Sequence, residues 1–72
     1  MYVTYDRSVD AAYVYLTDEE LIPGRDTVPV QEGVPHSVRG EVTLDFKDGR
    51  LVGIEVLAAS RTLPADLLAL AR

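Results

Sequence analysis

The clearest alternation of apolar and polar residues in the chain runs from Glu41 to Ser60. Apolar side chains occupy every second position on both sides of Lys47-Asp48-Gly49, which is typical of two half-buried strands. Asp-Gly favours a tight hairpin because glycine adopts positive φ without a steric penalty. A three-residue loop at 47–49 gathers the apolar side chains on one face, so it is the predicted loop. The pairs that it predicts are Phe46–Arg50, Leu44–Val52 and Val42–Ile54.

The same register predicts an acidic cluster on the other face of the hairpin. Glu41 would lie opposite Glu55, with Asp45 two positions further along its strand. Like charges in this arrangement repel, so they need a cation, an arginine or water beside them. Clustered carboxylates suit Mg²⁺ or Ca²⁺, which makes these three residues candidate metal ligands. We favour a solvated face, or an ion pair between Glu55 and one of the arginines Arg39, Arg50 and Arg61, and expect no metal.

Shorter patterns predict the elements before the hairpin. Residues 2–5 and 11–16 are rich in aromatic and β-branched residues, which is typical of strands, and the second run is apolar at nearly every position. Residues 17–26 form a loop, with the charge cluster Asp18-Glu19-Glu20 and the turn pair Pro23-Gly24. Residues 27–32 predict a strand that lies at an edge or is irregular, because Pro29 has no N–H to donate, with Val28 and Val30 directed inward.

The end of the chain changes to a helical spacing. Leu63, Leu67, Leu70 and Ala71 form one stripe, which predicts a helix over about 64–71 with Thr62 as N-cap. Leu68 lies off this stripe. The predicted fold is α+β, in a single domain over residues 1–72. It is a four- or five-stranded antiparallel sheet, arranged as a meander, with one short C-terminal helix packed on the apolar face of the hairpin.

Composition narrows the function classes. The 72 residues carry a net charge of −5, which argues against binding nucleic acid. The lack of cysteine excludes disulfides and is compatible with a cytoplasmic location. No apolar run approaches the length of a membrane span, so no membrane association is expected. A single core of this size supplies only about 3–5 kcal/mol, so oligomerisation is the expected additional stabiliser.

Two segments resemble a known family. They are Tyr5-Asp6-x-x-x-Asp10-Ala11-x-Tyr13-Val14 and Asp48-Gly49-x-Leu51-Val52-Gly53-Ile54-Glu55-Val56-Leu57-x-Ala59-Ser60. Over roughly residues 2–63 the chain resembles the small bacterial domain of unknown function 2283. The resemblance implies a small, single-domain, β-rich prokaryotic protein with no established activity, cofactor or catalytic residue. Members of similar small families sometimes sit beside toxin-like proteins, which raises the hypothesis of an antitoxin-like role.

His36 is the single histidine, and it lies in a loop flanked by glycine and proline. It is a candidate general base or ligand residue. Catalysis would also need a nucleophile and an orienting group nearby, and no such spacing is present. We therefore favour a solvated loop histidine, and we assign no catalytic residue.

Self-association has the best support of the candidate functions. One short helix cannot cover both faces of a sheet, and several apolar or aromatic residues lie off the predicted core face. We predict a homodimer or a higher symmetric oligomer. The predicted interface residues are Leu51, Leu57, Leu68, Tyr13 and Tyr15.

The predicted function is that of a non-enzymatic, self-associating protein-interaction module without a cofactor. Its sharper form is an antitoxin-like acidic partner of a basic protein, which rests on the net charge. The alternative is a small ligand- or metal-binding protein, or an enzyme, with a site between subunits. That site would be formed by His36, Glu41 and Glu55.

Overall fold

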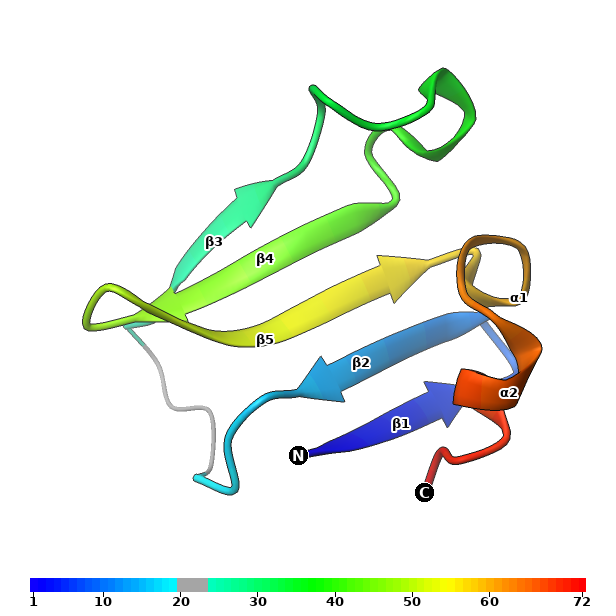
Figure 1. Cartoon of the computed structure of the whole chain (residues 1–72), viewed down its shortest axis with the longest axis horizontal. Coiled ribbons are helices and arrows are strands. Elements are labelled where there is room, and N and C mark those ends of the chain that lie inside the picture. The colour runs from blue at the N-terminus through cyan, green and yellow to red at the C-terminus, as the bar shows by residue number, and fades with distance from the viewer. Residues whose placement is uncertain (20–23) are drawn as a thin grey trace.

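The fold is a single antiparallel sheet with two short helices at its C-terminal end (Figure 1). It is known from a computed structural model, which describes residues 1–19 and 24–72. Glu20 and Pro23, both assigned to the first loop, lie outside the described residues. The elements are β1 (Tyr2–Asp6), β2 (Ala11–Tyr15), β3 (Asp26–Pro29), a 3₁₀ turn (His36–Val38), β4 (Val42–Lys47), β5 (Arg50–Leu57), α1 (Ala59–Thr62) and α2 (Ala65–Leu68).

The strand order is β1-β2-β5-β4-β3, and every neighbouring pair is antiparallel. A β1–β2 hairpin is therefore joined to the β3–β4–β5 meander by the pairing of β2 with β5. This arrangement confirms the predicted α+β class and the antiparallel sheet. The short strand β3 lies at an edge, as Pro29 predicts, because the missing N–H then interrupts no ladder. Val28 lies opposite Leu44, on the apolar face as predicted, but its side chain is 48% exposed.

The loop predicted for the β4–β5 hairpin is wrong. Lys47 pairs with Arg50, so the loop has two residues, and Asp48 and Gly49 both have positive φ (52° and 76°). This is the combination that a type I′ turn requires. A bulge at Val52 then shifts the register by one residue. The bulge restores apolar pairing beyond the turn, but with partners other than those predicted: Leu44 with Ile54 and Val42 with Val56.

One face of the sheet is apolar and is covered only in part. Its positions on the three central strands are Ala12, Val14, Val42, Leu44, Phe46, Leu51, Ile54 and Val56. Ala12 and Val56 are 2% exposed, and with Ala59 they form the core, against which Leu63 and Leu68 pack. Both helices lie at the end of the sheet beside β1, β2 and β5, away from β3 and β4 (Figure 1). Leu44, Phe46 and Ile54 are therefore only half-buried.

The C-terminal segment differs from the predicted single helix over 64–71. Leu63 is extended (φ −107°, ψ 150°) and separates α1 from α2. The cause is Pro64, because the ring of a proline disfavours the helical conformation in the residue before it. α2 ends at Leu68, so Leu70 lies beyond the helix and is 74% exposed. The predicted stripe is thus wrong, and Leu68, predicted to lie off the core face, packs against the core instead.

Candidate functional site

The face of the sheet opposite the apolar one carries a buried carboxylate. Asp45 on β4 is 4% exposed and is the only buried charged side chain among the described residues. Its Oδ2 accepts hydrogen bonds from the Tyr13 hydroxyl and from Nε of Arg25, the latter at 3.2 Å. Its Oδ1 accepts a hydrogen bond from the Thr27 hydroxyl at 2.8 Å. These donors come from β2, from β3 and from the residue before β3, so Asp45 holds together strands that are distant in sequence.

Gly53 makes the contact between Tyr13 and Asp45 possible. It lies on β5, between the strands of the two partners, and pairs with Asp45 on one side and Tyr15 on the other. The Tyr13 ring crosses over this glycine, and a Cβ built there would overlap the ring and its hydroxyl. A glycine inside a strand weakens the sheet, so its presence indicates a close approach of another group. Here that group is the phenol of Tyr13.

The surroundings fix the protonation states of the pair. Burial opposes ionisation of Asp45, but the hydrogen bonds from Tyr13 and Thr27 and the charge of Arg25 outweigh it, so the pKa of Asp45 lies below its usual value. Burial, and then the hydrogen bond to Asp45, raise the pKa of Tyr13 well above its ordinary value. Tyr13 is therefore a neutral donor and Asp45 an ionised acceptor at neutral pH. General acid–base catalysis favours groups with a pKa near the working pH. Here the pKa of Tyr13 is raised and that of Asp45 is lowered, so both lie further from neutral pH than usual.

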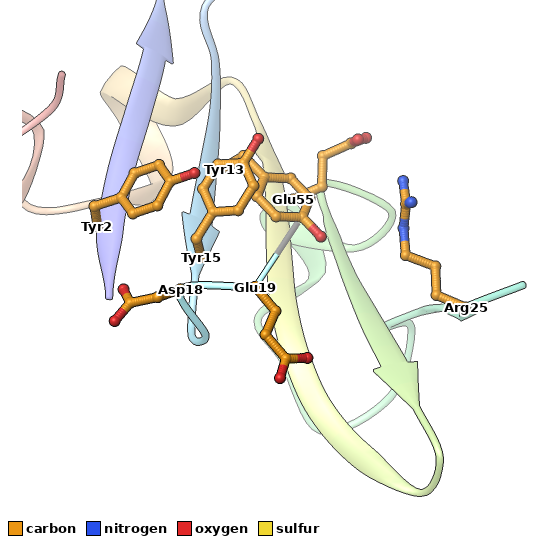
Figure 2. Close-up of a pocket in the computed structure, with 7 residues that line it drawn as sticks. All are labelled: Tyr2, Tyr13, Tyr15, Asp18, Glu19, Arg25 and Glu55. Carbon is orange, nitrogen blue, oxygen red and sulfur yellow. The ribbon is translucent and has the colours of Figure 1, made fainter. Parts of the chain in front are cut away.

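A cleft lined by tyrosines adjoins this network (Figure 2). The rings of Tyr2 and Tyr15 are stacked with centroids 4.4 Å apart, and Tyr13 lies 4.6 Å from Tyr15 at an angle of 52°. The cleft has a volume of about 550 Å³ and opens to solvent. Its lining residues are Tyr2, Tyr13, Tyr15, Asp18, Glu19, Arg25 and Glu55.

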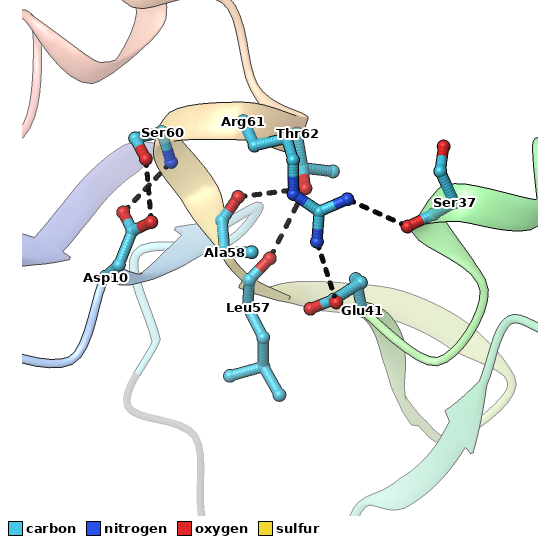
Figure 3. Close-up of polar contacts among 8 residues, drawn as sticks. All are labelled: Asp10, Ser37, Glu41, Leu57, Ala58, Ser60, Arg61 and Thr62. Atoms are coloured by element: carbon cyan, nitrogen blue, oxygen red, sulfur yellow. Dashed lines mark hydrogen bonds and ion pairs between the residues drawn. The ribbon is translucent and has the colours of Figure 1, made fainter.

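A second polar network anchors the C-terminal segment to the sheet. Asp10, in the turn after β1, accepts hydrogen bonds from the Tyr5 hydroxyl at 2.6 Å and from both N–H and hydroxyl of Ser60 at 2.9 and 2.7 Å. The bonds from Tyr5 and then Ser60 lower the pKa of Asp10. Figure 3 shows Asp10 reaching the start of α1. The two segments that resemble the family thus meet here. Their polar residues Tyr5, Asp10 and Ser60 hydrogen-bond to one another and hold α1 against the turn after β1.

The predicted acidic cluster is not assembled. Glu55 lies opposite Thr43 and not Glu41, because the bulge changes the register. Glu41 instead accepts a bond of 3.0 Å from Arg61, which also donates to the Ser37 carbonyl at 2.9 Å (Figure 3). Over residues 1–19 and 24–72, no group of three histidine or acidic side chains is arranged to hold a metal ion. The candidate metal site at Glu41, Asp45 and Glu55 therefore gains no geometric support.

The remaining candidate residues lie in four separate places. His36 is exposed in the 3₁₀ turn. Leu51 and Leu57 on β5 are 39% and 43% exposed. Tyr13 and Tyr15 form part of the cleft wall, and Leu68 packs on the core on the other side of the sheet. The predicted interface residues do not form one surface, and their role in association stays a prediction.

Three contributors to the buried network around Asp45 were not predicted as site residues: Arg25, Thr27 and Gly53. The sequence does mark Gly53, because a glycine interrupts the apolar residues of a predicted strand at this position. Arg25 and Thr27 flank the start of a weakly patterned strand, and no sequence pattern connects them to Asp45. Only the β3–β4 register, which pairs Thr27 with Asp45, brings them together.

Comparison with known proteins places the chain in a family. The family model described as "Protein of unknown function (DUF2283)" matches residues 2–60, which is most of the chain, so the chain belongs to that family. Searches of curated proteins and of solved structures find no match. In the described residues, no helix is long and apolar enough to cross a membrane.

Proposed function

We propose that this member of the DUF2283 family is a non-enzymatic, cytoplasmic protein-interaction module that self-associates through the apolar face of its sheet. The observation that carries the proposal is the incomplete cover of that face. The positions on β2, β4 and β5 that share it are all apolar, yet burial falls from 2% exposure at Val56, beside the helices, to half-burial at Leu44 and Phe46. Contiguous apolar surface of this kind marks an interface.

The total exposed area supports the same proposal. The chain exposes 5042 Å². A folded monomer of 7.9 kDa is expected to expose about 4,400 Å². The excess, about 600 Å², is close to the ~800 Å² that each partner buries in a standard interface. A second copy is the occupant that this excess fits best, since an isologous pair of sheets packed face to face covers the same surface on both chains.

The proposed surface differs from the predicted interface. Leu57, Tyr13 and Tyr15 lie on the opposite face of the sheet, whereas Leu51, opposite Phe46, lies on the apolar face. Tyr13 is engaged with Asp45, and the other face carries the charged cleft, which is costly to bury against a copy of itself. The neutral apolar face carries no such penalty. The pKa values of Tyr13 and Asp45 are shifted away from neutral pH, which is unfavourable for acid–base catalysis. The network therefore also supports a structural role over an enzymatic one.

Sedimentation equilibrium of the wild type and two variants tests the proposal. Leu44→Lys places a charge on the apolar face, whereas Thr43→Lys places the same charge on the neighbouring residue of the opposite face. We expect the wild type and Thr43→Lys to have twice the 7.9 kDa of one chain at micromolar concentration, and Leu44→Lys to be monomeric. A wild-type monomer across the micromolar range contradicts the proposal.

A further inference from the structure

The tyrosine-lined cleft has an unneutralised negative charge. Among the described residues the lining carboxylates Glu55 and Glu19 form no ion pair, whereas Asp18 is paired with the N-terminal amine at 3.0 Å. Arg25, the cationic lining residue, is held at 3.2 Å by the buried Asp45, which compensates its charge. Glu55 lies directly opposite Tyr13 on the neighbouring strand. A free carboxylate thus lies beside an aromatic ring at the edge of a cleft that opens to solvent (Figure 2).

The aromatic wall suits a cation. The face of a tyrosine ring attracts an ammonium or guanidinium group that lies within about 6 Å of its centroid. The chain already makes this contact twice: the guanidinium of Arg72 lies 4.1 Å from the Tyr2 centroid, and that of Arg7 lies 5.6 Å from the Tyr5 centroid. Tyr13 and Tyr15 line the cleft without such a partner among the described residues.

We propose that this cleft receives an arginine or lysine side chain of a partner protein, which lies against the aromatic wall of Tyr13 and Tyr15 and pairs with the carboxylate of Glu55. A side chain on a partner is favoured over a free small cation because the cleft is open to solvent and leaves a small ion largely hydrated. The exposed Leu57 shares the face of Glu55 and offers an apolar contact to residues beside the cation. The acidic net charge of −5 draws basic partners towards the surface.

The inference does not depend on self-association, since the cleft lies on the face opposite the proposed dimer surface. An experiment that contradicts self-association therefore leaves the proposed cation binding intact, and the reverse also holds. The inference gives a physical basis to the hypothesis of an acidic partner for a basic protein, and it names the residues at which that partner would be recognised.

Titration by NMR, which follows the ring signals of Tyr13 and Tyr15 and the carboxyl carbon of Glu55, tests the inference. The probe is the capped peptide Gly-Leu-Arg-Leu-Gly, compared with the same peptide containing neutral citrulline in place of arginine, and with tetramethylammonium. We expect the arginine peptide to bind with a Kd of about 1 mM or below, which corresponds to a single anchored side chain. The citrulline peptide and tetramethylammonium are expected to bind more weakly.

Two matched variants distinguish a specific site from general attraction. Glu55→Gln removes the carboxylate of the cleft, and Glu32→Gln removes an exposed carboxylate from the loop before the 3₁₀ turn. We expect Glu55→Gln to weaken binding about two- to fivefold, and Glu32→Gln to leave it unchanged. Equal weakening by both variants, or equal binding of the citrulline peptide, overturns the inference. Tetramethylammonium that binds as tightly as the arginine peptide overturns the assignment to a protein partner.

Discussion

Replacing Gly53 with alanine tests whether the crossing of Tyr13 over β5 stabilises the fold. The added Cβ would overlap the phenol ring, so Tyr13 must move and its hydrogen bond to Asp45 is lost. Asp45 is 4% exposed and would keep its charge with one donor fewer. Leaving a buried polar group short of a partner costs about 1–3 kcal/mol, and more for a charged one. The intrinsic gain from replacing glycine by alanine, about 0.5–1 kcal/mol, offsets only part of this.

We therefore expect Gly53→Ala to lower the free energy of unfolding by about 1–3 kcal/mol, a large share of what a core of this size supplies. Urea unfolding followed by far-ultraviolet circular dichroism suits the measurement, because the chain has no tryptophan. All variants are compared at one protein concentration, since association contributes to the apparent stability.

The control is the same substitution in a chain that carries Tyr13→Ala. Without the ring there is nothing for the Cβ to overlap, so Gly53→Ala should then be neutral or stabilising by up to about 1 kcal/mol. The two substitutions should therefore show a coupling energy of about 1–4 kcal/mol, the difference between these two effects. An equal effect of Gly53→Ala in both backgrounds would show that the cost comes from the backbone and not from the crossing ring of Tyr13.

Two further predictions concern backbone and charge. Because the folded pKa of Asp45 is lowered, its stabilisation is complete above the unfolded value of about 3.9 and is lost as the pH falls through the folded pKa. Asp45→Asn should therefore lose less stability than the wild type between about pH 5 and pH 3 in urea unfolding, and parallel losses would contradict the assignment. Ala58 precedes α1 with φ +49°, a conformation that costs a residue with a Cβ about 1 kcal/mol. Ala58→Gly should raise the melting temperature, and a lower one would show that its methyl group contributes more than the strain.

The sequence was informative wherever one local pattern decided the outcome. Alternation located β4 and β5, and Pro29 located the edge strand. The register of the hairpin could not be obtained in this way, because a two-residue turn with a bulge at Val52 and a three-residue loop both gather the apolar residues on one face. The energetic difference between them lies in turn geometry and twist, which periodicity does not report.

The candidate site was less predictable for the same reason. Its residues Tyr13, Arg25, Thr27 and Asp45 come from separate strands or loops, and only the register of the whole sheet brings them together. Leu63 shows a different limit, because the effect of Pro64 on the residue before it divided a stripe that helical spacing alone treats as continuous.

The most direct test of the proposed self-association is a filtered NOE experiment on a mixture of ¹³C-labelled and unlabelled chains, which reports only contacts between chains. We expect intermolecular contacts among the methyl and aromatic protons of the apolar face: Val14, Leu44, Phe46 and Ile54. Contacts that instead involve Tyr13, Tyr15 or Leu57, or no intermolecular contacts at millimolar concentration, would contradict the claim that this face is where two copies meet.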